Sequence, residues 1–270
     1  CAYSDGGTLR DALAELIAQD VTLTVVAPAE ADAVADAARR VGAQAKVHVK
    51  IDTGMTRSGI RHDAAAALVE HVRRAEGVQL TGLYTHLATA DETDKSAARE
   101  QLRNFHAVVD AVGGRAGLIL HAANSAATID LPESHLDMVR PGIALYGYQP
   151  SDRMLRKLPL RPALRLTGRL MQVKDVPAHS RCGYGLTYEF ERPSRVGLVP
   201  IGYGDGYLRC LSGRTTMRVA GADVPVRGRI SMDQIIVDLT DCPAAKIGDE
   251  VEIVSNDPAA PHSVENLARL

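Results

Sequence analysis

Two tyrosines flanked by glycines are the residues of this sequence whose types and spacing first suggest chemistry. Tyr184 stands between Gly183 and Gly185, and Tyr203 stands in the segment GYGDG. Glycine permits positive φ and the close approach of a ligand, so phenols held between glycines can face a binding site instead of a core. A β-hairpin with ordinary turn glycines explains the same pattern. The two tyrosines alone favour the hairpin and leave a functional interpretation open.

Several charged side chains follow segments that are predicted to be strands. Lys50 ends one such segment, and Arg57 lies seven residues later in the same loop. His86 ends another segment and is followed by Asp91, while Arg140 precedes a Pro-Gly turn. Taken singly, Lys50 and Arg57 are explained as a solvated surface pair, and His86 as a structural histidine. A cation held at a rigid turn, however, suits one fixed acceptor.

Composition excludes several classes of function. The chain has 270 residues, 46% of them hydrophobic, and a formal net charge of -2, so no basic surface for nucleic acid or anionic membranes is predicted. No apolar run approaches the roughly 20 residues that span a bilayer, and no signal peptide is recognisable, so we expect a cytoplasmic protein. Four scattered cysteines without a CxxC pair and nine scattered histidines predict neither a disulfide framework nor a metal site.

Helices and strands alternate in the first half of the chain. Strands are predicted at residues 21–26, 46–51, 78–86, 118–121 and 143–147, and helices at 8–17, 29–41, 62–75 and 93–112. Alternation at this spacing implies a parallel sheet, and the polar motifs DTGMTRSG, HLATADE and ANSAA follow its strands, where ligands bind in such sheets. Five strands are fewer than the eight of a closed (β/α)8 barrel. Either the sheet is open or the chain has lost its beginning before Cys1.

The second half is predicted to be all β. Prolines interrupt any long helix there, and β-branched runs predict strands at residues 163–173, 195–201, 215–220, 224–230, 234–239 and 250–254. The chain ends within an amphipathic helix whose apolar face is unfinished at Leu270. We therefore expect an α/β domain over residues 1–154, a partial (β/α)8 TIM barrel, followed by a truncated β-rich domain over residues 155–270.

Seven motifs occur in one order across most of the chain, and together they resemble alanine racemase. They read VHVKIDTGMTRSGI, YTHLATADE, HAANSAA, DMVRPGIALYG, CGYGLTY, VPIGYGDGY and GRISMDQ. Each is weak alone, but the set is specific. The resemblance implies a fold-type III pyridoxal 5'-phosphate enzyme, built from a (β/α)8 barrel and a β domain, that interconverts L- and D-alanine for peptidoglycan. It also implies a homodimer with shared active sites.

The resemblance assigns expected roles residue by residue. Tyr184 matches a catalytic base that serves the partner subunit's site, and His86 matches the histidine that hydrogen-bonds this tyrosine near the cofactor ring. Arg140 matches the donor to the pyridine nitrogen. The ring and phosphate segments correspond to Asn124, Ser125, Gly142 and Ile143.

Further matches concern the substrate and its entrance. Arg57 and Met232 resemble contacts to the substrate carboxylate, and Lys50 matches a lysine often carbamylated, which would orient Arg57. Asp91 and Tyr203 resemble residues that line the substrate entrance.

General chemistry agrees with these roles. Removal of an α-proton from an amino acid at neutral pH requires an electron sink, and a pyridoxal Schiff base supplies one. A phenol with an ordinary pKa near 10 is a poor base unless neighbours stabilise its anion. An arginine stays protonated, so Arg140 would leave the ring nitrogen without a proton of its own and weaken the sink.

The sequence departs from the family pattern at its ends. The family's other base is the lysine that holds the cofactor, in a motif resembling KADAYGHG, and no lysine of this sequence stands in that context. The family's C-terminal tyrosine is also absent, and Ser231 replaces a common cysteine. We expect an internal fragment that is inactive alone. Two alternatives stay open: a broader-specificity racemase or decarboxylase of the same fold, and a non-catalytic homologue.

Overall fold

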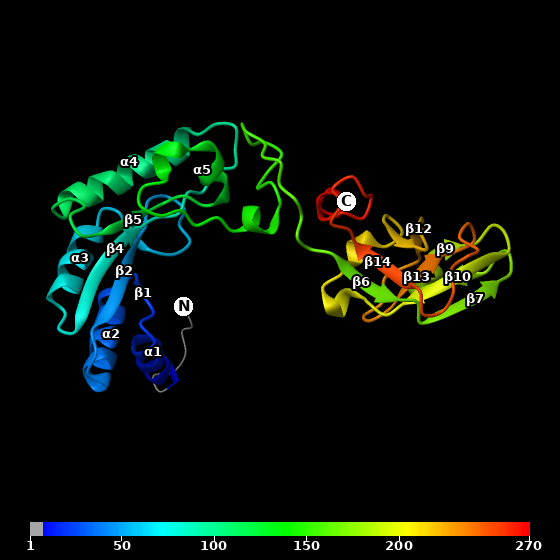
Figure 1. Ribbon diagram of the computed structural model, residues 1–270, viewed down its shortest axis with the longest axis horizontal. Coiled ribbons are helices and arrows are strands. Elements are labelled where there is room, and N and C mark those ends of the chain that lie inside the picture. The colour runs from blue at the N-terminus through cyan, green and yellow to red at the C-terminus, as the bar shows by residue number, and fades with distance from the viewer. Residues whose placement is uncertain (1–7) are drawn as a thin grey trace. The chain divides into compact units, whose positions relative to one another are not determined.

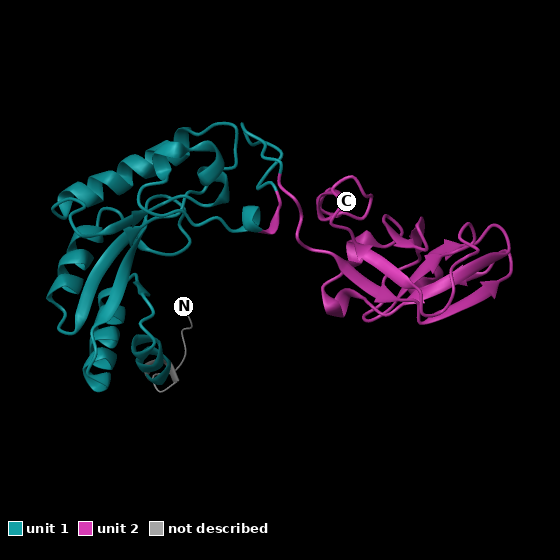
Figure 2. Cartoon of the chain, viewed as in Figure 1, with its two compact units in different colours: residues 1–145, 149–159 teal, residues 146–148, 160–270 magenta. Residues whose placement is uncertain are grey.

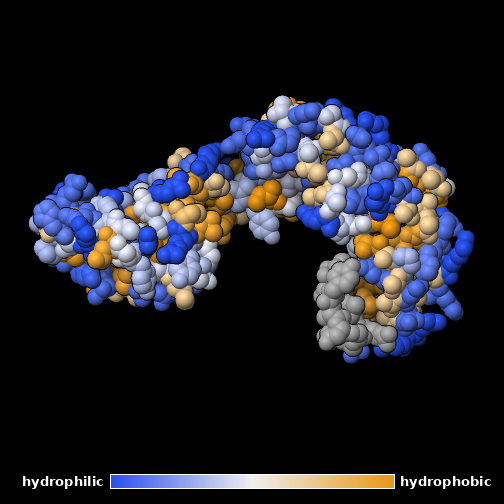
Figure 3. Space-filling model, turned by 180° about the vertical axis from the view of Figure 1, so that it is seen from behind, coloured by the Kyte–Doolittle hydropathy of each residue, from blue (hydrophilic) through white to orange (hydrophobic). Residues whose placement is uncertain are grey.

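Two compact units make up the chain in the computed structural model, which describes residues 8–270 (Figure 1). Cys1 lies outside the described residues. Unit 1 comprises Cys1–Leu145 and Gln149–Pro159, and unit 2 comprises Tyr146–Tyr148 and Leu160–Leu270 (Figure 2). Hydrophilic residues cover most of the face seen in Figure 3, with apolar residues gathered in patches. No helix within residues 8–270 is long and apolar enough to cross a membrane.

Unit 1 alternates helices and strands, as its sequence predicts. Its elements are α1 (Thr8–Ala18), β1 (Leu23–Val25), α2 (Pro28–Val41), β2 (Ala45–Asp52), β3 (Ile60–Arg61), α3 (Ala65–Arg74), β4 (Val78–Tyr84), α4 (Ser96–Ala111), β5 (Ile119–His121), α5 (Ser125–Asp130), and the 3-10 turns η1 (Pro132–Ser134) and η2 (Ile143–Tyr146). Four strands pair in parallel in the order β1-β2-β4-β5, and the short β3 pairs with β2. The predicted parallel α/β sheet is confirmed.

Strand β2 shows how the sheet separates an apolar face from a polar one. Its residues alternate strictly between buried and half-buried positions. Val47, Val49 and Ile51 belong to the apolar core that the sheet shares with α2, α3 and α4. Because alternate side chains of a strand point to opposite faces, His48 and Lys50 share the other face. The carboxyl edge and this polar face therefore carry the candidate site.

The strand predicted at residues 143–147 is wrong, because that segment forms the 3-10 turn η2. The hydroxyl of Ser125 accepts hydrogen bonds from the backbone N–H groups of Gly142 (2.7 Å) and Ala144 (3.3 Å) and bends the chain there. Leu145 N–H donates to the Gly142 carbonyl at 3.0 Å and closes the turn. The fifth strand of the sheet is β3 instead.

Unit 2 is built mainly from antiparallel strands. Its elements are β6 (Leu166–Arg169), β7 (Gln172–Val176), β8 (Arg181–Cys182), η3 (Tyr184–Leu186), β9 (Tyr188–Glu189), β10 (Ser194–Val199), η4 (Tyr203–Asp205), η5 (Arg209–Leu211), β11 (Thr216–Val219), β12 (Ala222–Arg227), β13 (Ile235–Asp238), β14 (Glu250–Val254) and α6 (Val264–Ala268). Seven strands follow the order β6-β14-β11-β12-β13-β10-β7, and β8 pairs only with β9. The predicted β-rich second half is confirmed.

One long strand was predicted at residues 163–173, but the structure has two. Strand β6 pairs with β14 and β7 pairs with β10, so consecutive strands lie at opposite ends of the seven-strand order. The chain changes partner at Leu170, whose N–H donates to the Asp249 carbonyl, and at Met171, whose N–H donates to the Leu198 carbonyl. The side chain of Leu170 is buried in the core of unit 2.

Candidate active site

Arg140 is the centre of a hydrogen-bonded group on unit 1. Its guanidinium donates to Nδ1 of His121 at 2.6 Å and to the carbonyl of Thr85 at 2.7 Å, and it lies 3.3 Å from Nδ1 of His86. His86 directly follows Thr85 after β4, and His121 ends β5. An arginine held by two histidines and a carbonyl has a single orientation, because its planar donors leave little freedom.

The histidines of this group are held neutral. Burial, followed by the positive charges of Arg140, Arg57 and Lys50, lowers the pKa of His86 to about 4. Burial and the charge of Arg140 likewise lower the pKa of His121 to about 3. A neutral imidazole can accept from Arg140 on one nitrogen and carry its proton on the other. At neutral pH each ring therefore has one acceptor and one donor nitrogen.

Lys50 and Arg57 lie in the same electrostatic environment. Burial and the charges of Arg57 and Arg140 lower the pKa of Lys50, while Asp52 raises it. The carboxylate of Asp52 accepts hydrogen bonds from the N–H groups of three loop residues at 2.9–3.1 Å, which organises the loop that carries the exposed Arg57. All three backbone donors share Oδ1 of Asp52, the carboxylate that raises the Lys50 pKa.

The residues predicted to surround the cofactor lie together beside Arg140. Asn124 caps α5, accepting from Ala127 N–H at 3.0 Å and donating to the Leu87 carbonyl at 3.1 Å. Its neighbour Ser125 holds Gly142 by accepting the hydrogen bond from its N–H group. Ile143 follows in the same turn with an exposed side chain. Asp91 lies half-buried in the loop between β4 and α4.

Tyr184 lies in unit 2, at the tip of the β8–β9 hairpin. Its flanking glycines both have positive φ, 73° at Gly183 and 74° at Gly185, so the glycine-flanked hairpin is confirmed. A Cβ at Gly183 would lie 2.9 Å from the backbone nitrogen of Arg229, because the hairpin packs closely on that segment. The side chain of Tyr184 is 68% exposed. Its phenol therefore lies on the surface of unit 2.

Tyr203 and Met232, also in unit 2, are neighbours in space. Tyr203 N–H donates to the Ser231 carbonyl at 3.0 Å, and Gly204 N–H donates to the Met232 carbonyl at 2.8 Å. Glycine is needed at position 202 for these two backbone segments to pack so closely, since a Cβ there would lie 2.2 Å from the Ser231 carbonyl oxygen. Both side chains are exposed, at 43% and 60%. The entrance and substrate residues predicted in unit 2 are therefore brought together.

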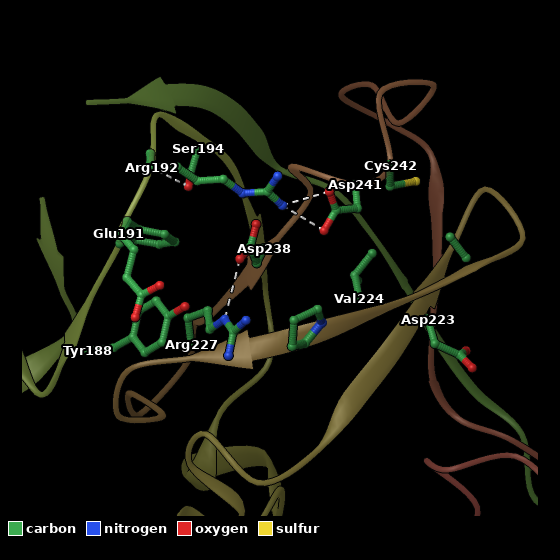
Figure 4. Close-up of a pocket in the computed structure, with 13 residues that line it drawn as sticks. Tyr188, Glu191, Arg192, Ser194, Asp223, Val224, Arg227, Asp238, Asp241 and Cys242 are labelled. Atoms are coloured by element: carbon green, nitrogen blue, oxygen red, sulfur yellow. Dashed lines mark hydrogen bonds and ion pairs between the residues drawn. The ribbon is translucent and has the colours of Figure 1, made fainter. Parts of the chain in front are cut away.

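A pocket of about 520 Å³ in unit 2 has a different lining (Figure 4). Arg192 donates to both carboxylate oxygens of Asp241 there, at 2.7 and 2.8 Å, and Arg227 donates to Asp238 at 3.4 Å. Both arginines that line the pocket are thus paired with carboxylates of the same pocket. None of the residues predicted to act on substrate or cofactor lines this pocket.

Three polar residues of the site were missed in the sequence. Tyr84 stacks on His121, with ring centroids 4.6 Å apart, and its ring lies 5.1 Å from the Arg140 guanidinium carbon. His121 in turn lies 2.8 Å from His48, measured from Nε2 to Nδ1. The signal that could have found them is the alternation of β2, which places His48 on the face of Lys50, and the position of His121 at a strand end.

Two family profiles of known proteins match nearly the whole chain. The profile of the alanine racemase N-terminal domain matches residues 3–150, and that of the C-terminal domain matches residues 163–270. The chain belongs to the alanine racemase family. Its α/β unit is accordingly part of the family's TIM-barrel-like domain, and unit 2 is its β-rich C-terminal domain.

Relatives of the family support this membership. Alanine racemase of Desulfovibrio desulfuricans is 45% identical over 91% of this chain and 67% of its own length. The structure of alanine racemase from Clostridium difficile 630 matches with a TM-score of 0.88 and 35% identity, over 99% of this chain and 69% of that one. A complex of that racemase with cycloserine matches with a TM-score of 0.84 and 32% identity, over 99% and 68%. The chain spans about two thirds of the length of its curated relatives.

Proposed function

We propose that the full-length gene product is a pyridoxal-phosphate-dependent alanine racemase that interconverts L- and D-alanine. The observation that carries the proposal is Arg140, oriented between two neutral histidines at the carboxyl edge of a parallel sheet. Ligands bind at this edge in α/β barrels. Family membership supplies the reaction class, and the geometry of the described residues fits it.

The site suits a planar, anionic cofactor. Lys50, Arg57 and Arg140 supply positive charge to this site, which the carboxylate of Asp52 opposes at Lys50. In our proposal Arg140 donates to the ring nitrogen. The Asn124–Ser125 segment and the Gly142–Ile143 turn hold the ring and phosphate. Bound to an amino acid, pyridoxal phosphate supplies an electron sink for the pair left by the α-proton.

His86 is oriented to support a phenolate. Its Nδ1 faces Arg140, which can only donate, so its proton is on Nε2 and is available to a second acceptor. We propose that this acceptor is the oxygen of Tyr184 of the partner subunit, which removes or returns the α-proton on one face. Neutrality of His86 preserves that donor without adding a competing acid near pH 7.

The remaining residues receive substrate roles in this proposal. Arg57 and Met232 contact the alanine carboxylate, and Asp91 and Tyr203 line its entrance. Carbamylation turns Lys50 from a cation into an anion that orients Arg57, and the lowered pKa of the Lys50 amine favours the neutral form that reacts with carbon dioxide. A shared active site makes the working form a homodimer.

The proposed product is D-alanine for peptidoglycan, whose precursors are made in the cytoplasm, and we place the protein there. Cycloserine, present in the structure of the Clostridium difficile relative, is expected to inhibit it. Curated relatives named alanine racemase do not favour the decarboxylase or non-catalytic alternatives. Assays with serine, lysine and arginine beside alanine test the substrate breadth.

The experiment is deuterium exchange at the α-carbon of each alanine enantiomer by the full-length gene product loaded with pyridoxal phosphate. Tyr184→Phe should abolish interconversion while leaving the absorbance of the bound cofactor unchanged. Tyr188→Phe is the matched control, because it removes a phenolic hydroxyl four residues along the same hairpin and keeps the ring that contacts Arg227. Normal turnover by Tyr184→Phe would refute the role of Tyr184, and absence of turnover in the unchanged protein would refute the proposed reaction.

A further inference from the structure

An irregularity in the sheet brings His48 close to the Arg140 group. Strands β2 and β4 pair residue by residue until the register shifts, so that Val47 lies opposite Leu80 but His48 lies opposite Gly82. Such a bulge re-aims a side chain next to a site. A Cβ at Gly82 would lie 2.6 Å from Nε2 of His48. The bulge and the glycine together make room for the imidazole.

The hydrogen bonds determine where the protons lie. Arg140 has no acceptor, so Nδ1 of His121, 2.6 Å away, must be unprotonated. A neutral His121 then carries its proton on Nε2, which lies 2.8 Å from Nδ1 of His48. His48 Nδ1 therefore accepts, and its own proton lies on Nε2. Both hydrogen bonds of His121 are therefore satisfied together only when its proton is on Nε2.

We propose that His48 is a positioning residue that holds His121 in the Nε2–H tautomer, so that His121 always presents an acceptor to Arg140. In the other tautomer the Nδ1–H of His121 would face an N–H of Arg140 across 2.6 Å, and the guanidinium would lose His121 as an acceptor. Arg140 is half-buried and its pKa is lowered by burial, so an unsatisfied donor there is costly. Through this chain His48 orients Arg140 without touching it.

Two substitutions separate this role from packing. In His48→Asn the amide oxygen occupies the place of Nδ1 relative to Cβ and still accepts from His121. In His48→Leu an apolar side chain of similar size fills the space but accepts nothing.

The direct readout is ¹⁵N NMR of the imidazoles in full-length, histidine-labelled protein, with His121→Gln used to assign His121. The unchanged protein and His48→Asn should show His121 protonated on Nε2 only. His48→Leu should show a mixture of tautomers. A proton on Nδ1 of His121 in the unchanged protein overturns the proposal by itself, even where a variant does not fold.

The effect on cofactor binding rests on the proposed function and is measured separately. His48→Leu should weaken the affinity for pyridoxal phosphate about tenfold, the loss of one hydrogen bond, and His48→Asn should restore it. If every variant lacks affinity, the proposed function fails, while the tautomer of His121 still decides this inference. Equal tautomers and equal affinities in His48→Leu and the unchanged protein would show that His48 only packs.

Discussion

Replacement of Lys95 by Met should strongly destabilise unit 1. Lys95 Nζ donates to Asp130 at 3.0 Å and to the Ala90 carbonyl at 2.7 Å, and the two charged side chains are 2% and 0% exposed. Breaking a buried ion pair leaves an uncompensated charge and costs about 3–5 kcal/mol. Asp130 keeps the N–H groups of Leu155 and Arg156 at 2.8 and 3.0 Å and the ion pair with the Arg156 guanidinium at 3.8 Å. We therefore expect the lower end of this range, about 3 kcal/mol.

Arg99→Met is the matched control, since it removes one positive charge from the same helix one turn later. Arg99 pairs with Glu133 at 3.0 Å, but these side chains are 56% and 46% exposed, so its loss should cost less than about 1 kcal/mol. Urea denaturation, with hydrogen exchange of α4 and α5 peptides to isolate unit 1, measures both. A difference below about 1 kcal/mol between the variants would refute the reasoning about burial. Adding Asp130→Asn to Lys95→Met should recover only part of the stability, because the buried charge is gone but the amide has one oxygen to accept from the two N–H groups of Leu155 and Arg156.

Three other predictions concern the site. Gly202→Ala forces its Cβ against backbone 2.2–2.4 Å away and should raise KM for alanine by moving Met232, with a smaller effect on kcat. Lys50 should gain the mass of one carbon dioxide in bicarbonate buffer, detected by native mass spectrometry; Lys50→Ala should not. The pKa values of His86 (about 4) and His121 (about 3) lie below the ordinary value of 6.5, so the unfolded chain binds more protons in acid. The urea concentration at the unfolding midpoint should therefore decrease as the pH is lowered from about 7 to about 4. His121→Gln should make this decrease smaller.

Local patterns predicted much of unit 1. The alternation in β2 and the alanine-rich face of α2 were visible because each element's periodicity depends only on its own residues. The ends of the predicted strands also marked His86 and Lys50 as candidates. The residue types alone indicate that these side chains could take part in a reaction. The order of the seven motifs indicates which family, and therefore which reaction, they belong to.

Long-range contacts decided what local patterns could not. Residues 143–147 have strand-like composition, yet the Ser125 hydroxyl, 17 and 19 residues away, captures two of the neighbouring N–H groups and bends the chain. Nothing near Leu170 indicates that the chain changes from one sheet edge to the other. His48 and His121 are 73 residues apart and meet only because β2, β4 and β5 are neighbours in the sheet.

The same electrostatics link the stability of unit 1 to the charge of Lys50. Burial lowers the pKa of His86 most, and the charges of Arg140, Arg57 and Lys50 lower it further, so these three cations repel additional positive charge at one place. Asp52, the nearby carboxylate, is engaged by three backbone N–H groups and gives only partial relief. Such a cluster is costly until an anion enters it, because like charges in a partly buried site are poorly screened. In the proposed function a carbamate on Lys50 replaces one of these cations by an anion, so we expect carbamylation of Lys50 to stabilise unit 1.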